Sequence, residues 1–205
     1  MKSLPSQRST IAVLSVLMLS IGGCGQETKV TRVDAGVVTD LSGRWNDTDS
    51  RMVAESMVKE ALEYPWLNKF TEGKHRQPVV VVGTVLNSSH EHINVQTFVT
   101  DLERELSNSQ KVTFVAGKSE REEVRNERKE QAMYAREDTQ KAPGKEIGAD
   151  YMMKGTIATI LDEADGTKAM FYQVDLQMVD LENNTKAWFG QKKIKKVIEK
   201  KRSIF

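Results

Sequence analysis

Apolar residues recur along the chain with a helical period in three places. From Met52 to Leu62 their spacing predicts a helix, with good N-cap residues at positions 47–49 (Asp, Thr, Asp). Pro65 predicts its end, because the residue before a proline avoids helical geometry. A second helix is predicted from Ile93 to Leu106. A third, from Ser119 to Arg136, has few apolar residues, so we expect it to be mostly solvated.

Other segments have the composition or the alternation of strands. Val79 to Val82 is a continuous β-branched run, typical of a strand buried on both faces and therefore central in a sheet. Val112 to Val115 predicts a short strand. The last third predicts three more, at Tyr151–Ile160, Met170–Val179 and Lys186–Ile198. The order α-β-α-β-α-β-β-β predicts an α/β domain of the α+β type, with a mixed sheet of about five strands flanked by helices.

The N-terminus has a different pattern. Lys2 and Arg8 precede an apolar stretch from Ile11 to Ile21, which is too short to span a bilayer as a permanent helix. Two glycines then lead to Cys24, the only cysteine of the chain, which has no partner for an internal disulfide. We therefore interpret residues 1–23 as a signal peptide of an exported protein.

Leu19 to Cys24 resembles the bacterial lipobox, whose cysteine becomes the new N-terminus. The resemblance implies covalent diacylglycerol and an N-acyl lipid on Cys24, and no other cofactor is expected. More than one acyl chain makes anchoring stable. Because Gly25 and not Asp follows, the usual inner-membrane retention signal is absent. This implies an outer-membrane lipoprotein that faces the periplasm.

Composition limits the rest of the chain to one domain. The 205 residues, 39% of them hydrophobic, suffice for one compact core and not for two. Residues 24–45 are polar and without helical period, and we interpret them as a tether that spans at most about 75 Å. Residues 46–205 form the predicted single domain with a basic C-terminal tail. A net charge of +1 gives no indication of nucleic-acid binding.

No catalytic signature is present, and we predict that the chain is not an enzyme. It lacks a nucleophile motif, a phosphate loop and a dinucleotide fingerprint. His90 and His92 suggest a metal-dependent hydrolase as one alternative, but a solvated helix entrance explains them better, and no metal site is predicted. The acids of the charged helix alternate with Lys and Arg, which indicates exposed ion pairs.

The C-terminal strand is basic. From residue 186 onward there are eight Lys or Arg residues and one acid. On a strand, Lys192 and Lys196 point to one face, and Lys193 and Lys195 to the other. Either these lysines discourage edge-to-edge aggregation of the sheet, or they bind an anionic partner such as acidic wall components or phospholipid headgroups.

Arg44 and Trp45 are a second candidate for partner binding. An arginine and an aromatic residue beside a tether are typical of interface anchors. The alternative, which we favour, is that Trp45 fixes the first helix to the core, as hydrophobic residues before an N-cap often do.

Four stretches together resemble the LpoB-type lipoproteins, activators of penicillin-binding proteins. They are DLSGRWNDTDS (Asp40–Ser50), KEIGADYMMKGTI (Lys145–Ile157), FYQVDL (Phe171–Leu176) and KAWFGQKKIKK (Lys186–Lys196). The resemblance implies a fold similar to the TolB N-terminal domain and direct contact with a bifunctional peptidoglycan synthase, whose activity rises. The chain departs from better-known members in its short tether, which has no proline.

Two functions of different classes follow. The leading hypothesis is an outer-membrane lipoprotein that binds and activates a peptidoglycan synthase of the penicillin-binding protein type, and so regulates cell-wall synthesis. The alternative is a structural subunit of an envelope assembly, such as a secretion or flagellar-base complex. A large oligomer in solution would favour the alternative.

Overall fold

The computed structural model describes residues 29–141 and 143–199. Cys24 and the signal peptide lie outside the described residues. The chain divides into two units, the first ending at Ala35 and the second beginning at Gly36. Residues 29–35 of the first unit contain no helix or strand. All that follows concerns the second unit, and the domain bounds expected from the sequence remain predictions.

Five strands form one mixed sheet in the order β2-β1-β3-β4-β5. Their bounds are Val79–Ser88 for β1, Thr113–Phe114 for β2, Tyr151–Ala164 for β3, Thr167–Asp180 for β4 and Lys186–Glu199 for β5. β1 runs parallel to both β2 and β3, whereas the β3–β4 and β4–β5 pairs are antiparallel. The predicted mixed sheet of about five strands is confirmed.

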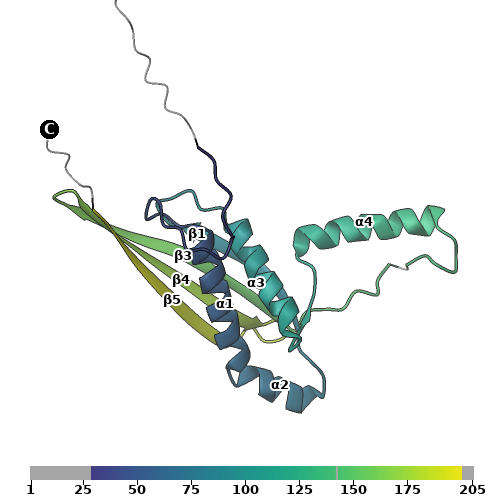
Figure 1. Ribbon diagram of the computed structural model, residues 1–205. Helices are drawn as coiled ribbons and strands as arrows, with labels where there is room; N and C mark the ends of the chain where they lie inside the picture. The colour runs from purple at the N-terminus through teal and green to yellow at the C-terminus, as the bar shows by residue number, and fades with distance from the viewer. Residues whose placement is uncertain (1–28, 142, 200–205) are drawn as a thin grey trace, which may run out of the picture. The chain divides into compact units, whose positions relative to one another are not determined.

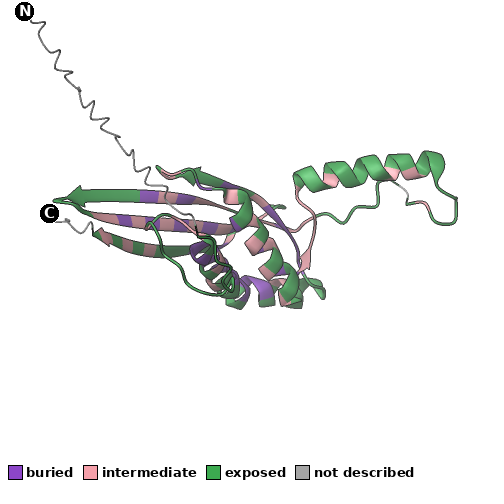
Figure 2. Cartoon of the chain, turned by 45° about the horizontal axis from the view of Figure 1, so that its top comes forward, coloured by how far each residue is buried: buried purple, intermediate pink, exposed green. Residues whose placement is uncertain are grey.

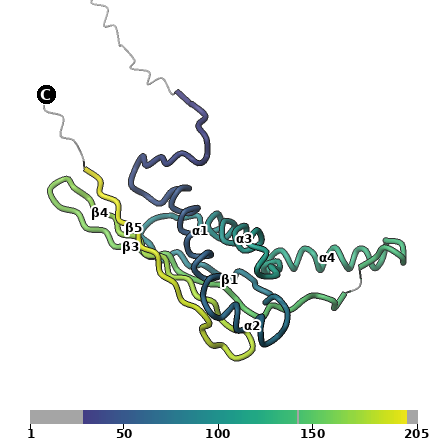
Figure 3. Tube along the Cα trace, turned by 60° about the horizontal axis from the view of Figure 1, so that its bottom comes forward, coloured from purple at the N-terminus to yellow at the C-terminus, as the bar shows by residue number. Residues whose placement is uncertain are grey.

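Four helices accompany the sheet: α1 (Asp47–Glu63), α2 (Trp66–Lys74), α3 (Val95–Ser109) and α4 (Lys118–Tyr134). α1 and α3 lie side by side on one face of the sheet (Figure 1). In Figure 1 and again in Figure 3, α4 lies away from the strands. The sequence predicted α1, α3 and α4, but not α2.

The beginning of α1 differs from its prediction, and α2 occupies a segment for which the sequence predicted no element. The N-cap is Asn46 and not one of residues 47–49: its side chain accepts a hydrogen bond from the Asp49 N–H, and the Asp49 carboxylate accepts one from the Asn46 N–H, both at 3.0 Å. α1 ends before Pro65 as predicted, with Tyr64 extended. Pro65 is then the N-cap of α2, because its fixed φ suits the start of a helix.

The core lies between the sheet and the pair α1–α3. On β4, Tyr172, Val174, Leu176 and Met178 are fully buried while their neighbours are not, which confirms the predicted alternation (Figure 2). The run Val79–Val82 is buried throughout, as predicted, but β2 pairs only with its first two residues, Val79 and Val80, whereas β3 continues along β1 on the other side. The described helices pack against one face only, and the other face of the β3–β5 part remains open to solvent.

Candidate functional site

The residues that precede α1 pack onto the domain through Trp45. Its ring lies 6.0 Å from the ring of Phe98 on α3 and 5.6 Å from that of Tyr172 on β4. The Trp45 N–H and the Tyr172 hydroxyl both donate to one carboxylate oxygen of Glu91, at 3.2 and 2.9 Å. Burial, with the bond to Glu91, raises the pKa of Tyr172, so the hydroxyl stays a donor. Trp45 thus holds the start of α1 against the core.

Lys196 is the centre of a small ion cluster on the same face. Its Nζ lies 2.6 Å from the Asp49 carboxylate and 2.7 Å from that of Asp40, and it donates to the Arg44 carbonyl at 3.2 Å. The side chains of Lys196 and Asp49 are only 11% and 9% exposed. Burial disfavours the charged lysine, yet the hydrogen bonds to Asp40 and Asp49 outweigh it and raise the pKa of Lys196. The pKa of Asp40 is lowered, chiefly by its bond to Lys196. The charge of Lys196 is therefore balanced inside the protein.

Lys192 is also engaged, because its Nζ donates to Ser56 Oγ on α1 at 3.1 Å. Arg44 behaves differently. Within the part of the chain that the structure describes, its guanidinium has no hydrogen bond or ion pair. It borders an open groove of about 620 Å³ together with Trp45, His90, Leu161 and Lys168. Among the predicted partner-binding residues on the helix-covered side, Arg44 is therefore the one whose charge has no partner in the described structure.

Lys193 and Lys195 lie on the open face of the sheet, as the alternation predicted. Register places Lys195 beside Phe171 of β4, which in turn pairs with Ile160 of β3. Val197 shares this face two residues from Lys195, so apolar and cationic side chains occur side by side there, and Phe189 lies further along the same face of β5, opposite Gln177. We call this set, Ile160, Phe171, Phe189, Lys193, Lys195 and Val197, the open-face patch.

Three members of the open-face patch are exposed apolar residues: Ile160 is 65%, Phe189 55% and Val197 59% exposed. None of the three was predicted from the sequence to belong to a site. The available signal was their position, since each stands at an outward place of a strand whose inward residues are also apolar. Large apolar residues gathered on an uncovered surface are typical of protein interaction sites.

The histidines form no metal centre in the region described. His90 Nδ1 lies 3.1 Å from Thr159 Oγ1, and the His90 N–H donates to the same hydroxyl. Across residues 29–141 and 143–199, no group of three or more His, Cys, Asp or Glu is placed to hold an ion. Among the same residues, no helix is both long and apolar enough to cross a bilayer.

Comparison with known proteins gives a family. The family described as peptidoglycan-synthase activator LpoB matches residues 49–194. No curated protein matches the chain. The LpoB C-terminal domain from Escherichia coli is 17% identical, covers 71% of this chain and 98% of its own, and has a TM-score of 0.44. The NMR structure of E. coli LpoB is 15% identical, with 94% and 88% covered and a TM-score of 0.37. Lipoprotein GNA1162 from Neisseria meningitidis is 15% identical, with 62% and 88% covered and a TM-score of 0.37.

Proposed function

This chain belongs to the LpoB family of peptidoglycan-synthase activators, and on that premise we propose that it is an outer-membrane lipoprotein that binds a synthase of the penicillin-binding protein type and raises its activity. The resemblance predicted from the sequence is confirmed by the family match. Members of this family activate an enzyme and are not enzymes themselves. The observation that carries the proposal is the extent of the match, residues 49–194, which includes α1 to α4 and most of the sheet.

The open-face patch is the surface that we propose for the synthase contact. Its apolar residues provide apolar surface that becomes buried on binding. Lys193 and Lys195 provide positive charges that have no ion-pair partner in the described structure. Binding activates an enzyme only if the activator has higher affinity for the more active conformation. The contact must therefore discriminate between two states of the synthase.

The proposed anchor is lipid on Cys24, which sets how far the domain reaches. Asp40 is bound to Lys196 and to Asn46, so the chain is already held to the domain at Asp40, before Trp45. The 16 peptide steps from Cys24 to Asp40 span at most about 58 Å when extended. The synthase must therefore extend far enough from its own membrane to meet a domain held within that distance of Cys24.

A reconstituted polymerisation assay tests the partner. A chain beginning at residue 24 with Cys24→Ser is added to a purified bifunctional penicillin-binding protein, and glycan synthesis from lipid II is followed. We expect faster synthesis with this chain. Phe189→Glu and Lys195→Glu should each weaken the effect about tenfold at subsaturating concentration, which corresponds to a loss of about 1.4 kcal/mol of binding free energy. Lys59→Glu, an exposed position on α1, is the matched control. An unchanged rate with the parent chain would refute the proposed activity.

The anchor is tested separately. Cells that produce the full chain are labelled with radioactive palmitate and fractionated, and the purified protein is weighed by mass spectrometry. We expect label, and the mass of a diacylglycerol and an N-acyl group on Cys24, in the outer-membrane fraction. Cys24→Ser should lose the label. A wild-type protein without acyl groups would remove the proposed location.

A further inference from the structure

β1 has a long free edge. It pairs with β3 from Val80 to Ser88, but with β2 only at Val79 and Val80. The last bond on the β2 side is from the Val115 N–H to the Val80 carbonyl, after which the chain leaves toward α4. In a parallel sheet alternate residues direct their N–H and C=O groups to each neighbour. The register with β3 shifts at Gly83 and Thr84, which interrupts the alternation, but residues before and after this shift direct some of these groups to a side where no described strand lies.

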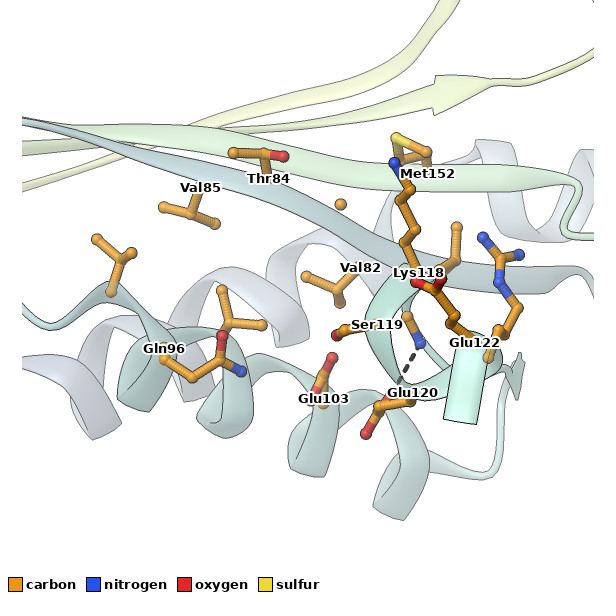
Figure 4. A pocket seen from close by; sticks show the side chains of 16 residues that line it. Val82, Thr84, Val85, Gln96, Glu103, Lys118, Ser119, Glu120, Glu122 and Met152 are labelled. Atoms are coloured by element: carbon orange, nitrogen blue, oxygen red, sulfur yellow. Dashed lines mark hydrogen bonds between the residues drawn. The ribbon is translucent and has the colours of Figure 1, made fainter. Parts of the chain in front are cut away.

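A groove of about 610 Å³ follows this edge. Its lining includes Val82 and Val85, which point toward α3, and Met152, which lies on the opposite side of β1 (Figure 4). Residues from both faces of the sheet border one cavity only where the sheet stops. Val95 and Val99 of α3 form its far wall. The groove thus occupies the position of a further strand that continues the line of β2.

The two edges of the sheet differ in charge. β5, at one edge, contains five lysines among 14 residues. β1 contains no charged residue from Val79 to Ser88. Lysines on an edge discourage pairing with another chain, and an uncharged edge lacks that protection. The composition of β1 therefore allows a strand to pair where β5 opposes it.

A carboxylate faces the groove without a counterion. Glu103 on α3 is half-buried, and among the residues described it has no hydrogen bond or ion pair. Burial, together with the nearby Glu120, raises its pKa. Figure 4 shows Glu103 and Glu120 on neighbouring helices at this wall, while Lys118 reaches across the α4 end of the groove. A cation brought by a ligand would relieve the charge on Glu103.

We infer that the β1 edge accepts an extended segment of a partner protein as a sixth strand. Its backbone pairs with the free edge from Val81 to Ser88, its alternate apolar side chains contact Val95 and Val99, and a Lys or Arg meets Glu103. A second copy fits less well, because its own β1 edge brings no cation and duplicates the carboxylate. The inference does not require that the partner be the synthase, and it goes beyond the activation proposed above.

A model peptide tests the backbone pairing. The probe is an acetylated, amidated eight-residue peptide with threonine at odd positions and valine, valine, lysine and valine at even ones. It is titrated into ¹⁵N-labelled mature chain that carries Cys24→Ser. We expect amide signals of residues 82–87 to shift and their hydrogen exchange to slow about tenfold, with little change in β5. The same peptide N-methylated at every residue should bind about tenfold more weakly, because it has no backbone donors toward β1 whichever way it runs.

Two variants test the charge. Glu103→Lys should weaken the lysine peptide about threefold and strengthen a version with glutamate at that place. Glu105→Lys, on the same helix but outside the groove and paired with Arg104, should change neither by more than about twofold. The inference would be overturned if the N-methylated peptide bound as tightly as the unmethylated one. It would also be overturned if the peptide shifted only amide signals that lie outside β1. A dimer whose β1 amides are protected without peptide would overturn it as well, since it would assign the edge to a second copy.

Discussion

Lys196 and Asp150 are charged residues whose contacts join distant parts of the chain. Lys196 connects β5 with Asp40 and Asp49, which lie near the start of α1. Asp150 accepts two hydrogen bonds of 2.7 Å from Arg76 and a third from the Val79 N–H, also 2.7 Å. Each holds two segments at a fixed distance, so each should contribute to stability beyond an ordinary surface ion pair.

Replacing Lys196 should destabilise the fold strongly. Lys196→Ala leaves Asp49, which is 9% exposed, without its cation, and we expect a loss of about 2–4 kcal/mol in the free energy of unfolding. Lys195→Ala, one residue away on the open face, should change it by less than about 0.5 kcal/mol. Urea unfolding of both variants measures the difference. Similar losses in the two would contradict the ion cluster.

Asp150 predicts a dependence of stability on pH. Its bonds from Arg76 lower the pKa of Asp150 against the opposing effect of burial. The unfolded chain therefore binds the proton more readily, and the stabilisation is fully present above the unfolded pKa of about 3.9 and lost as pH falls through the lower folded value. Asp150→Asn should be less stable than the parent at pH 7, and the gap should shrink below about pH 4. Urea unfolding at several pH values would show this, and a gap independent of pH would argue against it.

At the scale of elements, α4 differs from α1 and α3 because it has no buried residue. Its connection to the following segment is polar: Arg125 and Arg128 both contact Glu146, at 2.8 and 2.9 Å. Exposed pairs of this kind contribute little. The pKa of Glu146 is lowered, chiefly by the bond from Arg125, but the group is solvated. A helix of 17 residues without a packed face is only marginally stable.

Hydrogen exchange should distinguish the helices. We expect amides of residues 118–134 to exchange at least about a hundredfold faster than the central amides of α1 and α3, because opening α4 exposes no core. Exchange followed by proteolysis and mass spectrometry gives the rates by segment. Protection of α4 equal to that of α1 would mean that a surface of α4 is buried in solution.

At the scale of the whole molecule, helices cover one face of the sheet and leave the other open. Residues before α1 also contact the sheet, because Asp40, Gly43 and Trp45 contact β4 or β5. The two surfaces proposed above for protein contacts both lie on strands: the open-face patch on β3 to β5, and the free edge on β1. The two surfaces are on different parts of the sheet, so each can be changed by substitutions that leave the other surface intact.

Truncation should locate the true start of the domain. Compared with a chain that begins at Gly36, one that begins at Asn46 loses Trp45 and Asp40, and we expect its melting temperature to fall by about 6–15 °C. Differential scanning calorimetry of both measures this. Equal melting temperatures would support a domain that starts at residue 46.

The sequence alone determined the elements that depend on local patterns. Helical periods predicted three of the four helices, and alternation or β-branched composition predicted the five strands, because burial of one face or of both faces requires such patterns in any fold. The ends were less accurate: β3 and β4 continue past Ile160 and Met170 to a two-residue turn at Asp165 and Gly166, both with positive φ. The family resemblance likewise depended on sequence, and the predicted lipid anchor depends on Cys24.

Only the tertiary structure decided which candidate residues are free. Alternation predicted that Lys193 and Lys196 lie on opposite faces of the sheet. It did not predict which of these faces the helices cover. The contact of Lys196 with Asp49 spans 147 positions, and the free edge of β1 depends on where β2 ends. The physical reason is that exposure and pairing are set by neighbours in space, and a local pattern contains no information about which distant segment becomes the neighbour.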